Sequence, residues 1–234
     1  KLIKNHKCRL IVMFWNDQGY LLSKRSLDEN SIVIDVFTEE HGKCSGIVYG
    51  GSSSKKKNFF QIGNKMHLTF KSKNENKIGY FTVELLRAIS PPFFDDKKKS
   101  ISILSASSIL KILLPENQIN KKIYSSFEKL LEYMSHDDWI KLYILWELSL
   151  IKELGFEISG LIKKNTNNKS SYIEINEKLF KIPEIILNKK STNISNIDVS
   201  DALNFNKNVI YEHFIIPNKL RFPLSRNILQ KYFL

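Results

Sequence analysis

The sequence predicts an α+β protein, in which a small five-stranded β-barrel precedes a mainly α-helical domain. Residues 14–90 contain short runs of β-branched and aromatic residues that are separated by turn signals. After Pro91-Pro92, the hydrophobic residues recur with the three-to-four-residue spacing of helices. The chain has 234 residues, of which 42% are hydrophobic and 26% charged, so it can bury one large core or two small ones.

Five strands are expected in the first part of the chain, each ended by residues typical of turns. They are predicted at residues 19–25, 32–38, 44–49, 66–70 and 78–86. Five short strands with little helix between them suggest a small barrel, and the OB-fold is the commonest barrel of this size. An SH3-like barrel or part of a β-sandwich would give a similar pattern.

The boundaries of the barrel follow from the same patterns. Met13 is the first methionine, and the residues before it show no clear period. We therefore expect residues 1–12 to be a non-native or disordered extension, with Met13 as the natural start; the alternative is an edge strand over residues 8–12. Residues 13–90 are expected to form the barrel domain, and residues 91–234 the helical domain.

Helices are predicted over most of the second part. Their expected ranges are 100–114, 123–134, 139–154, 198–214 and 223–233, with a short helical turn at 183–187. Asp137 or Asp138 is expected to cap the third helix, and Gly155 to end it. Polar residues without periodicity predict a loop at 163–172, which is followed by a short strand at 172–175.

The net charge of +12 points to nucleic acid or to an anionic membrane as a partner. Only five basic residues are Arg, and Asn and Ile are plentiful, so coding bias contributes to the excess of Lys. The placement of the charge is more informative. Residues 1–90 hold 15 basic and 8 acidic side chains, whereas residues 91–234 hold 21 and 16. The smaller segment therefore carries the larger positive excess.

Basic residues of the barrel region fall mainly in predicted loops and at strand ends, where a nucleic-acid backbone could reach them. The candidate contacts are Lys24, Arg25, Lys43, Lys55, Lys56, Lys57 and Lys65. Aromatic faces stack on bases in barrels that bind single strands. Tyr49, Phe59 and Phe60 flank the three consecutive lysines and are candidates for this role. The alternative is that the two Phe residues belong to the barrel core and that the lysines form a solvated loop.

Motifs of catalysis are absent from the sequence. The five His residues have no metal-ligand spacing, and there is no Walker A, G-x-G-x-x-G or G-x-S-x-G motif. His41 lies beside Glu39 and Glu40, which is more typical of a solvated turn than of an acid–base site. The pairs Asp95-Asp96 and Asp137-Asp138 could hold a metal in a nuclease, but helix capping explains such residues more simply. We therefore predict a protein that is not an enzyme.

Cellular location is predicted from what the sequence contains. No apolar run approaches the ~20 residues that span a bilayer, and no secretory signal follows the basic start. Cys8 and Cys44 are too few for a four-ligand zinc site, and free thiols are expected rather than a disulfide. These features favour a cytoplasmic protein, associated with the nucleoid if it binds DNA.

Several segments of the chain resemble the RecO family of DNA repair and recombination proteins. In the barrel region these are Trp15–Ser23, Ile32–Gly42, Gly46–Gly51, Gln61–Asn64 and Phe81–Glu84. In the helical region they are Trp146–Phe156, with its Glu-Leu-Gly-Phe run, and Arg221–Arg226. The resemblance runs from about residue 14 to the end of the chain. It is specific through the combination of the run Phe37-Thr38-Glu39-Glu40-His41-Gly42 with the later Glu-Leu-Gly-Phe, since any one piece alone is a weak signal.

The resemblance implies an OB-fold, followed by a helical domain, that binds single- and double-stranded DNA and anneals complementary strands. It further implies action with RecR and help in loading RecA onto DNA coated by single-strand-binding protein, whose acidic C-terminal tail the family grips. Some relatives place Arg before the Glu-Leu of the central helix, where this chain has Ile144 and Leu145. Lys141 or Lys152 is the candidate to hold the tail instead.

A second departure concerns zinc. Many family members carry a four-Cys zinc site after the Glu-Leu-Gly-Phe helix, but residues 159–171 contain no Cys. We therefore expect no zinc and no other cofactor, with a zinc-less loop region near residues 159–182. Two rival functions stay open from the sequence: an interaction module without a DNA role, whose charge reflects coding bias, and a metal-dependent nuclease that uses one of the Asp pairs.

Overall fold

A computed structural model describes residues 13–53, 58–73, 78–158, 162–164, 171–188 and 194–234. The chain divides into two compact units. The barrel unit comprises the residues up to Ala88 together with Glu116–Ile119, and the helical unit comprises Ile89–Pro115 and Asn120–Leu234. The predicted extension at residues 1–12 lies outside the described residues.

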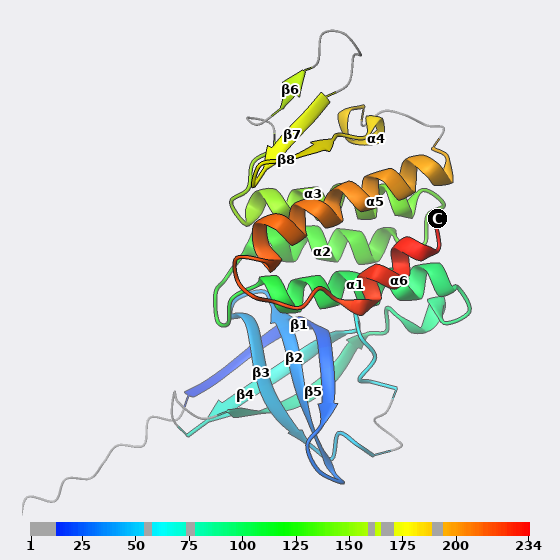
Figure 1. Ribbon diagram of the computed structural model, residues 1–234. Helices are drawn as coiled ribbons and strands as arrows, with labels where there is room; N and C mark the ends of the chain where they lie inside the picture. Colours follow the sequence, from blue (N-terminus) through cyan, green and yellow to red (C-terminus); the bar gives the residue numbers. More distant parts are fainter. Residues whose placement is uncertain (1–12, 54–57, 74–77, 159–161, 165–170, 189–193) are drawn as a thin grey trace, which may run out of the picture. The chain divides into compact units, whose positions relative to one another are not determined.

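The barrel unit contains five strands that close into a barrel (Figure 1). The strands are β1 (Met13–Ser26), β2 (Ser31–Thr38), β3 (Gly42–Tyr49), β4 (Lys65–Ser72) and β5 (Gly79–Arg87). Their order around the barrel is β1-β2-β3-β5-β4, and every pair is antiparallel except β3 with β5. The 14-residue β1 pairs with β4 along its first part and with β2 along its last part. The predicted α+β class with an N-terminal OB-type barrel is confirmed.

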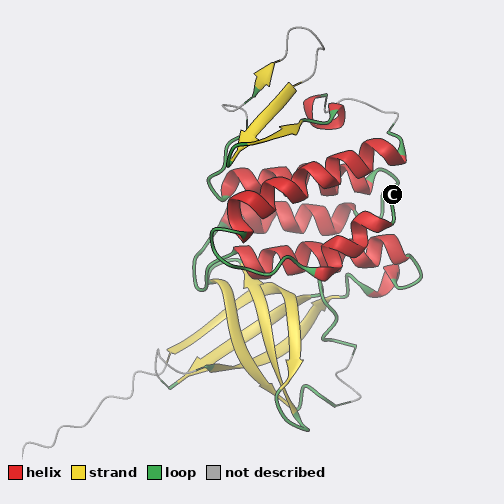
Figure 2. Ribbon diagram, viewed as in Figure 1, coloured by secondary structure: helices red, strands yellow, loops and turns green. Residues whose placement is uncertain are grey.

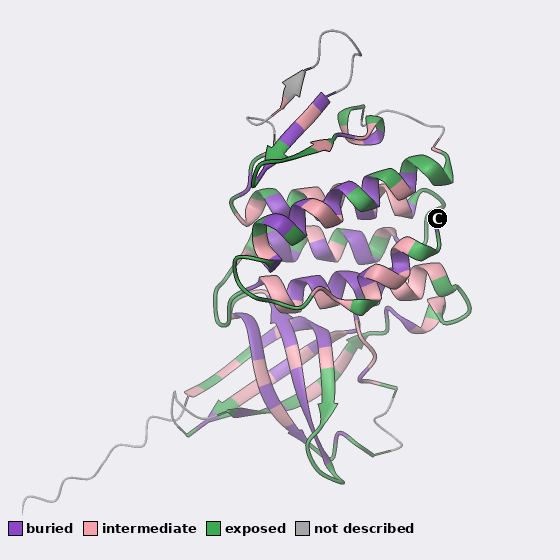
Figure 3. Ribbon diagram, in the orientation of Figure 1, coloured by how far each residue is buried: buried purple, intermediate pink, exposed green. Residues whose placement is uncertain are grey.

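Alternating side chains fill the barrel, as a period of two residues requires. Leu21, Ile34, Val36, Met66 and Leu68 are fully buried in the barrel core. Figure 3 colours the strands of the barrel by burial and shows long buried stretches along them. Each comes from a run that the sequence marks as β-branched or apolar, so burial of one face explains why these segments adopt extended structure.

Two glycines make the closure between β3 and β5 possible. Gly46 and Gly79 are direct partners in the short parallel pairing of these strands. A Cβ atom on Gly46 would lie 2.5 Å from the ring of Phe81, and one on Gly79 would collide with the ring of Phe70. Only residues without a side chain let both rings enter the core at this position.

The helical unit is built mainly from α1 (Lys97–Leu113), α2 (Lys121–Tyr133), α3 (Trp139–Glu153), α5 (Asn196–Ile210) and α6 (Leu224–Lys231), shown in Figure 2. Shorter elements are a 3-10 turn at Pro91–Phe93, α4 (Glu184–Leu187) and a π-helical turn, Tyr211–Ile215. Helix α1 packs against α6, α2 against α3, and α3 against α5. No helix among the described residues is long and apolar enough to cross a membrane.

Side chains at the helix ends explain where several helices begin and stop. The carboxylate of Asp96 accepts a hydrogen bond from the Lys99 amide at 3.0 Å, and the Asn120 side chain accepts one from the Ile123 amide at 3.0 Å. Gly155 has a φ of +100° and ends α3, as the sequence predicts. Asp138 does stand at the N-cap of α3, but its side chain makes no capping bond.

The region around residues 159–182 differs from the loop that the sequence suggests. Its described residues form a small antiparallel sheet of β6 (Lys163–Lys164), β7 (Ser171–Ile175) and β8 (Lys178–Lys181). Ile173 and Ile175 are buried on one face of β7, which anchors the sheet. The strand predicted at residues 172–175 is β7, which carries a clear apolar alternation. The polar composition concealed β6 and β8, which lack such an alternation.

A buried ion pair lies in the helical core. The Arg226 side chain on α6 donates to both carboxylate oxygens of Glu147 on α3, at 2.5 and 3.0 Å, and to the Leu203 carbonyl of α5 at 2.7 Å. Both charged side chains are fully buried. Burial is the largest single influence on the pKa of Arg226 and lowers it, but the charge and hydrogen bond of Glu147, together with Tyr143, leave the pKa of the guanidinium raised.

Neutral groups complete the contacts of the Glu147 carboxylate. The Tyr143 hydroxyl donates to Glu147 Oε1 at 2.9 Å, and the Asn206 amide donates to Oε2 at 3.1 Å. Burial, followed by the charge of Glu147, raises the pKa of Tyr143 well above its usual value, so the phenol keeps its proton. The pair and its neighbours therefore join α3, α5 and α6 through groups that have no access to water.

Breaking this pair from one side should destabilise the protein strongly. Arg226→Met leaves the Glu147 carboxylate buried without its counter-ion, and we expect a loss of about 3–5 kcal/mol in the free energy of unfolding. The double change Arg226→Met with Glu147→Leu removes both charges and should cost less than either single change. Urea unfolding followed by circular dichroism measures both. A single change within ~0.5 kcal/mol of the parent, the range of surface substitutions, would contradict the assignment.

Candidate nucleic-acid interface

Two of the predicted basic contacts stand where β1 runs into the β1–β2 turn. Lys24 and Arg25 are both exposed there, and Arg25 is the direct partner of Val33 on β2. The turn also holds Asp28, whose carboxylate accepts hydrogen bonds from the amides of Asn30 at 2.8 Å and Ser31 at 2.6 Å. The bond from Asn30 is the main cause that lowers the pKa of Asp28, so one negative charge lies near the two cations.

A second basic position lies on β4. Lys65 is half-buried, and its ammonium lies 5.6 Å from the centre of the Tyr20 ring, within reach of a cation–π contact. It is also the direct partner of Arg87 on β5. The structure thus brings a cation that the sequence analysis did not select, Arg87, beside one that it did. Only the register of the two strands reveals this neighbour.

The remaining lysines that the sequence predicts as nucleic-acid contacts of the barrel are not found at its described surface. The Lys43 side chain is only 10% exposed, and its ammonium lies 3.2 Å from the Glu116 carboxylate, so it is not offered at the surface. Lys55, Lys56 and Lys57 lie outside the described residues.

The three candidate aromatic residues separate in the same way. Phe60 is 1% exposed in the barrel core and Phe59 packs against that core, whereas Tyr49 is 62% exposed. Phe59 and Phe60 therefore belong to the barrel core, as the alternative interpretation of the sequence predicts, and only Tyr49 is exposed.

Residues 116–119 pack against the start of β3. The amide of Asn117 donates to the Lys43 carbonyl at 2.8 Å, and the Cys44 thiol lies 3.4 Å from Asn117 Oδ1. Gly42 has a φ of +71°, and a Cβ there would collide with the backbone of Gln118. Burial, followed by the charges of Glu116 and Asp17, raises the pKa of the Cys44 thiol to about 12.

This environment predicts a thiol that reacts only when the segment opens. With a pKa of about 12 instead of 9.0, Cys44 should carry ~1000-fold less thiolate at pH 8 and be alkylated correspondingly slowly. Iodoacetamide labelling of a Cys8→Ser variant, read by mass spectrometry, measures this. Rapid labelling that persists in the native protein would contradict the described contacts; labelling in urea is the control for reactivity.

The residues that suggested catalysis have structural roles in the described part of the chain. The Nδ1 atom of His41 lies 2.8 Å from the buried carboxylate of Asp17, not against Glu39 or Glu40. Its ring stacks on Trp15 with a centroid distance of 4.0 Å and an angle of 9°. Asp17 also accepts from the amide of Glu40 at 2.9 Å, which fixes the β2–β3 turn.

Neither Asp pair assembles a metal site among the described residues. Asp96 caps α1, and Asp138 hydrogen-bonds the Tyr133 hydroxyl, which is the main cause that raises the pKa of that tyrosine. No group of three or more His, Cys, Asp or Glu side chains that could hold a metal occurs in the described ranges.

A hollow of about 610 Å³ on the helical unit contains one of the two predicted tail-binding lysines. Its lining residues come from α2, α3 and the turn between them: Lys129, Glu132, Tyr133, His136, Asp138, Lys141, Leu142 and Leu145. Lys152 is not among them and lies 3.3 Å from Glu157. Sequence reasoning missed Lys129 and Tyr133, although their four-residue spacing places both on one side of a helix.

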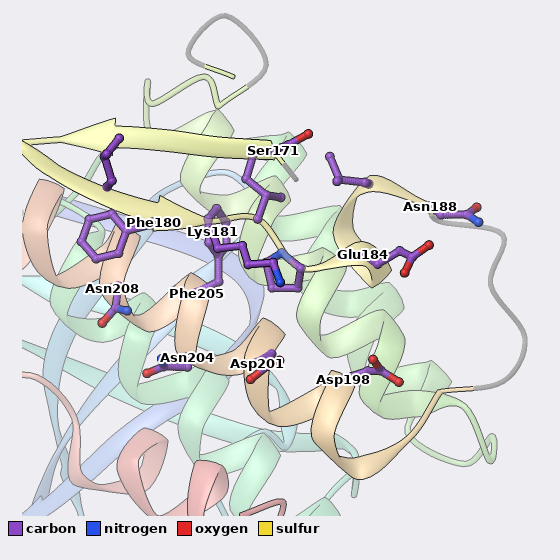
Figure 4. A pocket seen from close by; sticks show the side chains of 14 residues that line it. Ser171, Phe180, Lys181, Glu184, Asn188, Asp198, Asp201, Asn204, Phe205 and Asn208 are labelled. Atoms are coloured by element: carbon purple, nitrogen blue, oxygen red, sulfur yellow. The ribbon is translucent and has the colours of Figure 1, made fainter. Parts of the chain in front are cut away.

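A larger cavity of about 800 Å³ lies between β8, α4 and α5 (Figure 4). Its charged lining consists of Lys181, Glu184, Asp198 and Asp201. Figure 4 shows Asp198 and Asp201 along α5 on the side that faces β8. Three carboxylates against one ammonium give this cavity a negative balance, which disfavours phosphate.

The closed OB-type barrel, with Lys24 and Arg25 on β1, Lys65 on β4 and Arg87 on β5, and the separate helical unit define the class of OB-barrel proteins that carry a helical domain. Comparison with known proteins identifies the family. The N-terminal and C-terminal profiles of recombination protein O match residues 13–89 and 95–160, respectively. The chain belongs to the RecO family.

Several curated relatives are named DNA repair protein RecO. Those from Wolbachia pipientis subsp. Culex pipiens, Roseobacter denitrificans and Cereibacter sphaeroides strain ATCC 17029 are 33%, 31% and 34% identical over 62%, 63% and 62% of this chain. The matches span 60%, 61% and 60% of the relatives' own lengths. An Entamoeba histolytica asparaginyl-tRNA synthetase structure aligns over 90% of this chain and 59% of its own, with 12% identity and a TM-score of 0.30, which is too low to support any argument.

Proposed function

We propose that this protein is a non-catalytic DNA repair and recombination mediator that binds single- and double-stranded DNA and anneals complementary strands. The observation that carries the proposal is the closed OB-type barrel with exposed cations at Lys24 and Arg25, in a chain of the RecO family. The relatives' name supports the repair role. The activity is expected in the cytoplasm, at the nucleoid.

A basic protein surface can promote annealing because it reduces the electrostatic repulsion between two DNA strands. Two complementary strands repel each other through their phosphates, and a basic surface that neutralises phosphates on both lowers this repulsion. Each neutralised phosphate releases a counterion, so affinity falls with salt by about 0.9 log units per contact on duplex DNA and about 0.7 on single strands. Because phosphate contacts carry no base information, sequence preference should be weak.

The proposed direct partners are RecR and the acidic C-terminal tail of single-strand-binding protein. RecA is an indirect partner, because it loads onto DNA once single-strand-binding protein is displaced. The hollow between α2 and α3 suits an acidic tail with an apolar end. Lys129 and Lys141 supply two ammonium groups, beside the carboxylates of Glu132 and Asp138. Tyr133, Leu142 and Leu145 supply apolar surface. Lys152, beside Glu157, is the weaker candidate.

Loss of the barrel cations should reduce the salt dependence of DNA binding. Replacing Lys24 and Arg25 with Ala is expected to lower the slope of log affinity against log salt by about 1.5, and replacing Lys55, Lys56 and Lys57 by roughly 2. Fluorescence anisotropy with labelled oligonucleotides at several salt concentrations measures the slopes. The control removes two exposed lysines of the helical unit, Lys152 and Lys231. If both barrel variants keep the salt slope of the parent protein, the replaced barrel residues do not bind DNA.

Charge reversal in the hollow should weaken tail binding. Lys141→Glu is expected to reduce affinity for a labelled peptide of the acidic tail by about tenfold, because a like charge then faces the peptide. Lys231→Glu makes the same charge change on α6, outside the hollow, and should have little effect. An equal loss in both variants would indicate general charge attraction instead of a site.

The decisive experiment for the proposed function is annealing of complementary oligonucleotides coated with the cognate single-strand-binding protein. The protein should accelerate annealing, with a rate that falls as salt rises. No acceleration, together with elution from heparin at low salt, would favour an interaction module without a DNA role. Magnesium-dependent cleavage of the oligonucleotides would contradict the non-catalytic assignment and favour the alternative that the protein is a metal-dependent nuclease.

A further inference from the structure

Exposed aromatic side chains line up across one part of the barrel wall. Phe14 on β1 is the direct partner of Lys71 on β4, and Lys71 is the direct partner of Tyr80 on β5. Direct partners in a sheet point to the same face. All three are exposed, so this face is the outer one.

The neighbours of these residues along the strands confirm their outward direction. Trp15, Phe70 and Phe81 each follow or precede one member of the row, and all three pack into the barrel core. Side chains alternate between faces along a strand. The outward position of Phe14, Lys71 and Tyr80 is therefore fixed by the same pattern that buries the inner aromatic residues.

Tyr49 extends the row onto a fourth strand. Tyr80 is the partner of Ile47 on β3, and Tyr49 follows two residues later on the same face. The rings of Tyr49 and Tyr80 stack with a centroid distance of 5.2 Å and an angle of 24°. We call Phe14, Lys71, Tyr80 and Tyr49 the aromatic row.

The row presents exposed aromatic rings beside a positive charge. Phe14, Tyr80 and Tyr49 are 56%, 37% and 62% exposed, and the Lys71 ammonium lies 5.6 Å from the centre of the Phe14 ring. A hydrogen bond with Tyr80 is the main cause that raises the pKa of Tyr49, so this phenol adds no negative charge at neutral pH. Neighbouring strands lie about 4.8 Å apart, which separates Phe14 from Tyr80 by roughly 10 Å.

We propose that the aromatic row binds the unpaired bases of single-stranded nucleic acid, with the rings of Phe14, Tyr80 and Tyr49 stacking on bases and Lys71 meeting a phosphate. The inference rests on the proposed function and deepens it by giving single strands a site of their own. A flat ring face stacks on any base, so the site needs no sequence preference. The cation between Phe14 and Tyr80 complements a phosphate chain, and the row itself contains no carboxylate.

The register also links this row to a cation that the sequence selected. From Tyr80, direct partners lead through Ile47 and Val33 to Arg25 on the last part of β1. Val33 is buried, so the exposed surface is interrupted there. Phe14 and Arg25 both belong to β1, so this path of partners starts near the beginning of the strand, winds around the barrel and returns to the end of the same strand. Such a winding path suits a nucleic-acid strand that wraps partly around the barrel.

The test compares strands with and without bases. Tyr80→Ala and Tyr49→Ala should each weaken binding of oligothymidine by about tenfold, measured by fluorescence anisotropy. Binding of an abasic oligonucleotide with the same phosphates, and the salt slope on it, should stay at the parent values. Tyr80→Phe and Tyr49→Phe keep the ring and should retain most of the affinity. Thr82→Ala, an exposed change on the same strand, is the matched control.

Lys71→Gln tests the cation separately. It should lower the salt slope on both oligothymidine and the abasic strand by about 0.7, since one phosphate contact is lost. The base-stacking site would be contradicted if the tyrosine variants lost the same affinity for oligothymidine and for the abasic oligonucleotide, or lost affinity for neither.

Other outcomes distinguish rival occupants and the broader proposal. A shift in sedimentation of the tyrosine variants without loss of DNA binding would assign the row to contacts between copies of this chain. Loss of binding to the acidic tail peptide alone would assign it to that tail. If the parent protein binds neither oligonucleotide, the proposed function itself fails; if it binds both and the variants match it, only the aromatic row fails.

Discussion

The parallel pairing of β3 with β5 is the constraint on which the barrel surface depends. It closes the barrel through Gly46 and Gly79, whose missing side chains make room for the rings of Phe81 and Phe70. Closure removes the open edges at which a five-stranded sheet would otherwise pair with other chains. It also determines which outward residues are neighbours. Tyr49 on β3 contacts Tyr80 on β5 only because these two strands are paired.

The helical unit rests on a different kind of constraint. Its buried Arg226–Glu147 pair lies among Tyr143, Asn206 and the Leu203 carbonyl, and this set joins three helices from distant parts of the sequence. Apolar packing tolerates shifts between helices, whereas any shift that separates a buried ion pair leaves two uncompensated charges and is strongly destabilising. The barrel achieves a unique arrangement by backbone pairing, and the helical unit by side-chain polarity.

Periodicity was sufficient to predict the barrel and the long helices, because burial of one face dictates both patterns. It located five strands and the end of α3 at Gly155, but it missed β6 and β8, whose residues carry little apolar alternation. The site was harder to predict. Local sequence places a lysine at a strand end, but it does not show that Lys43 turns to Glu116 or that Arg87 stands beside Lys65. Those are consequences of pairings between residues far apart in the chain. Glu147 and Arg226 stood in family-like motifs, yet nothing in their spacing indicates that they meet.

The short segment Glu116–Ile119 gives the molecule an unusual connectivity. It belongs to the barrel unit, although the residues on both sides of it belong to the helical unit. The polypeptide therefore leaves the barrel, returns to it once, and leaves again. No single cut in the chain separates the two units into complete pieces. A barrel excised at residue 90 would lack the counter-ion of Lys43 and the cover over Cys44, and recombination of genes at that boundary would transfer an incomplete fold.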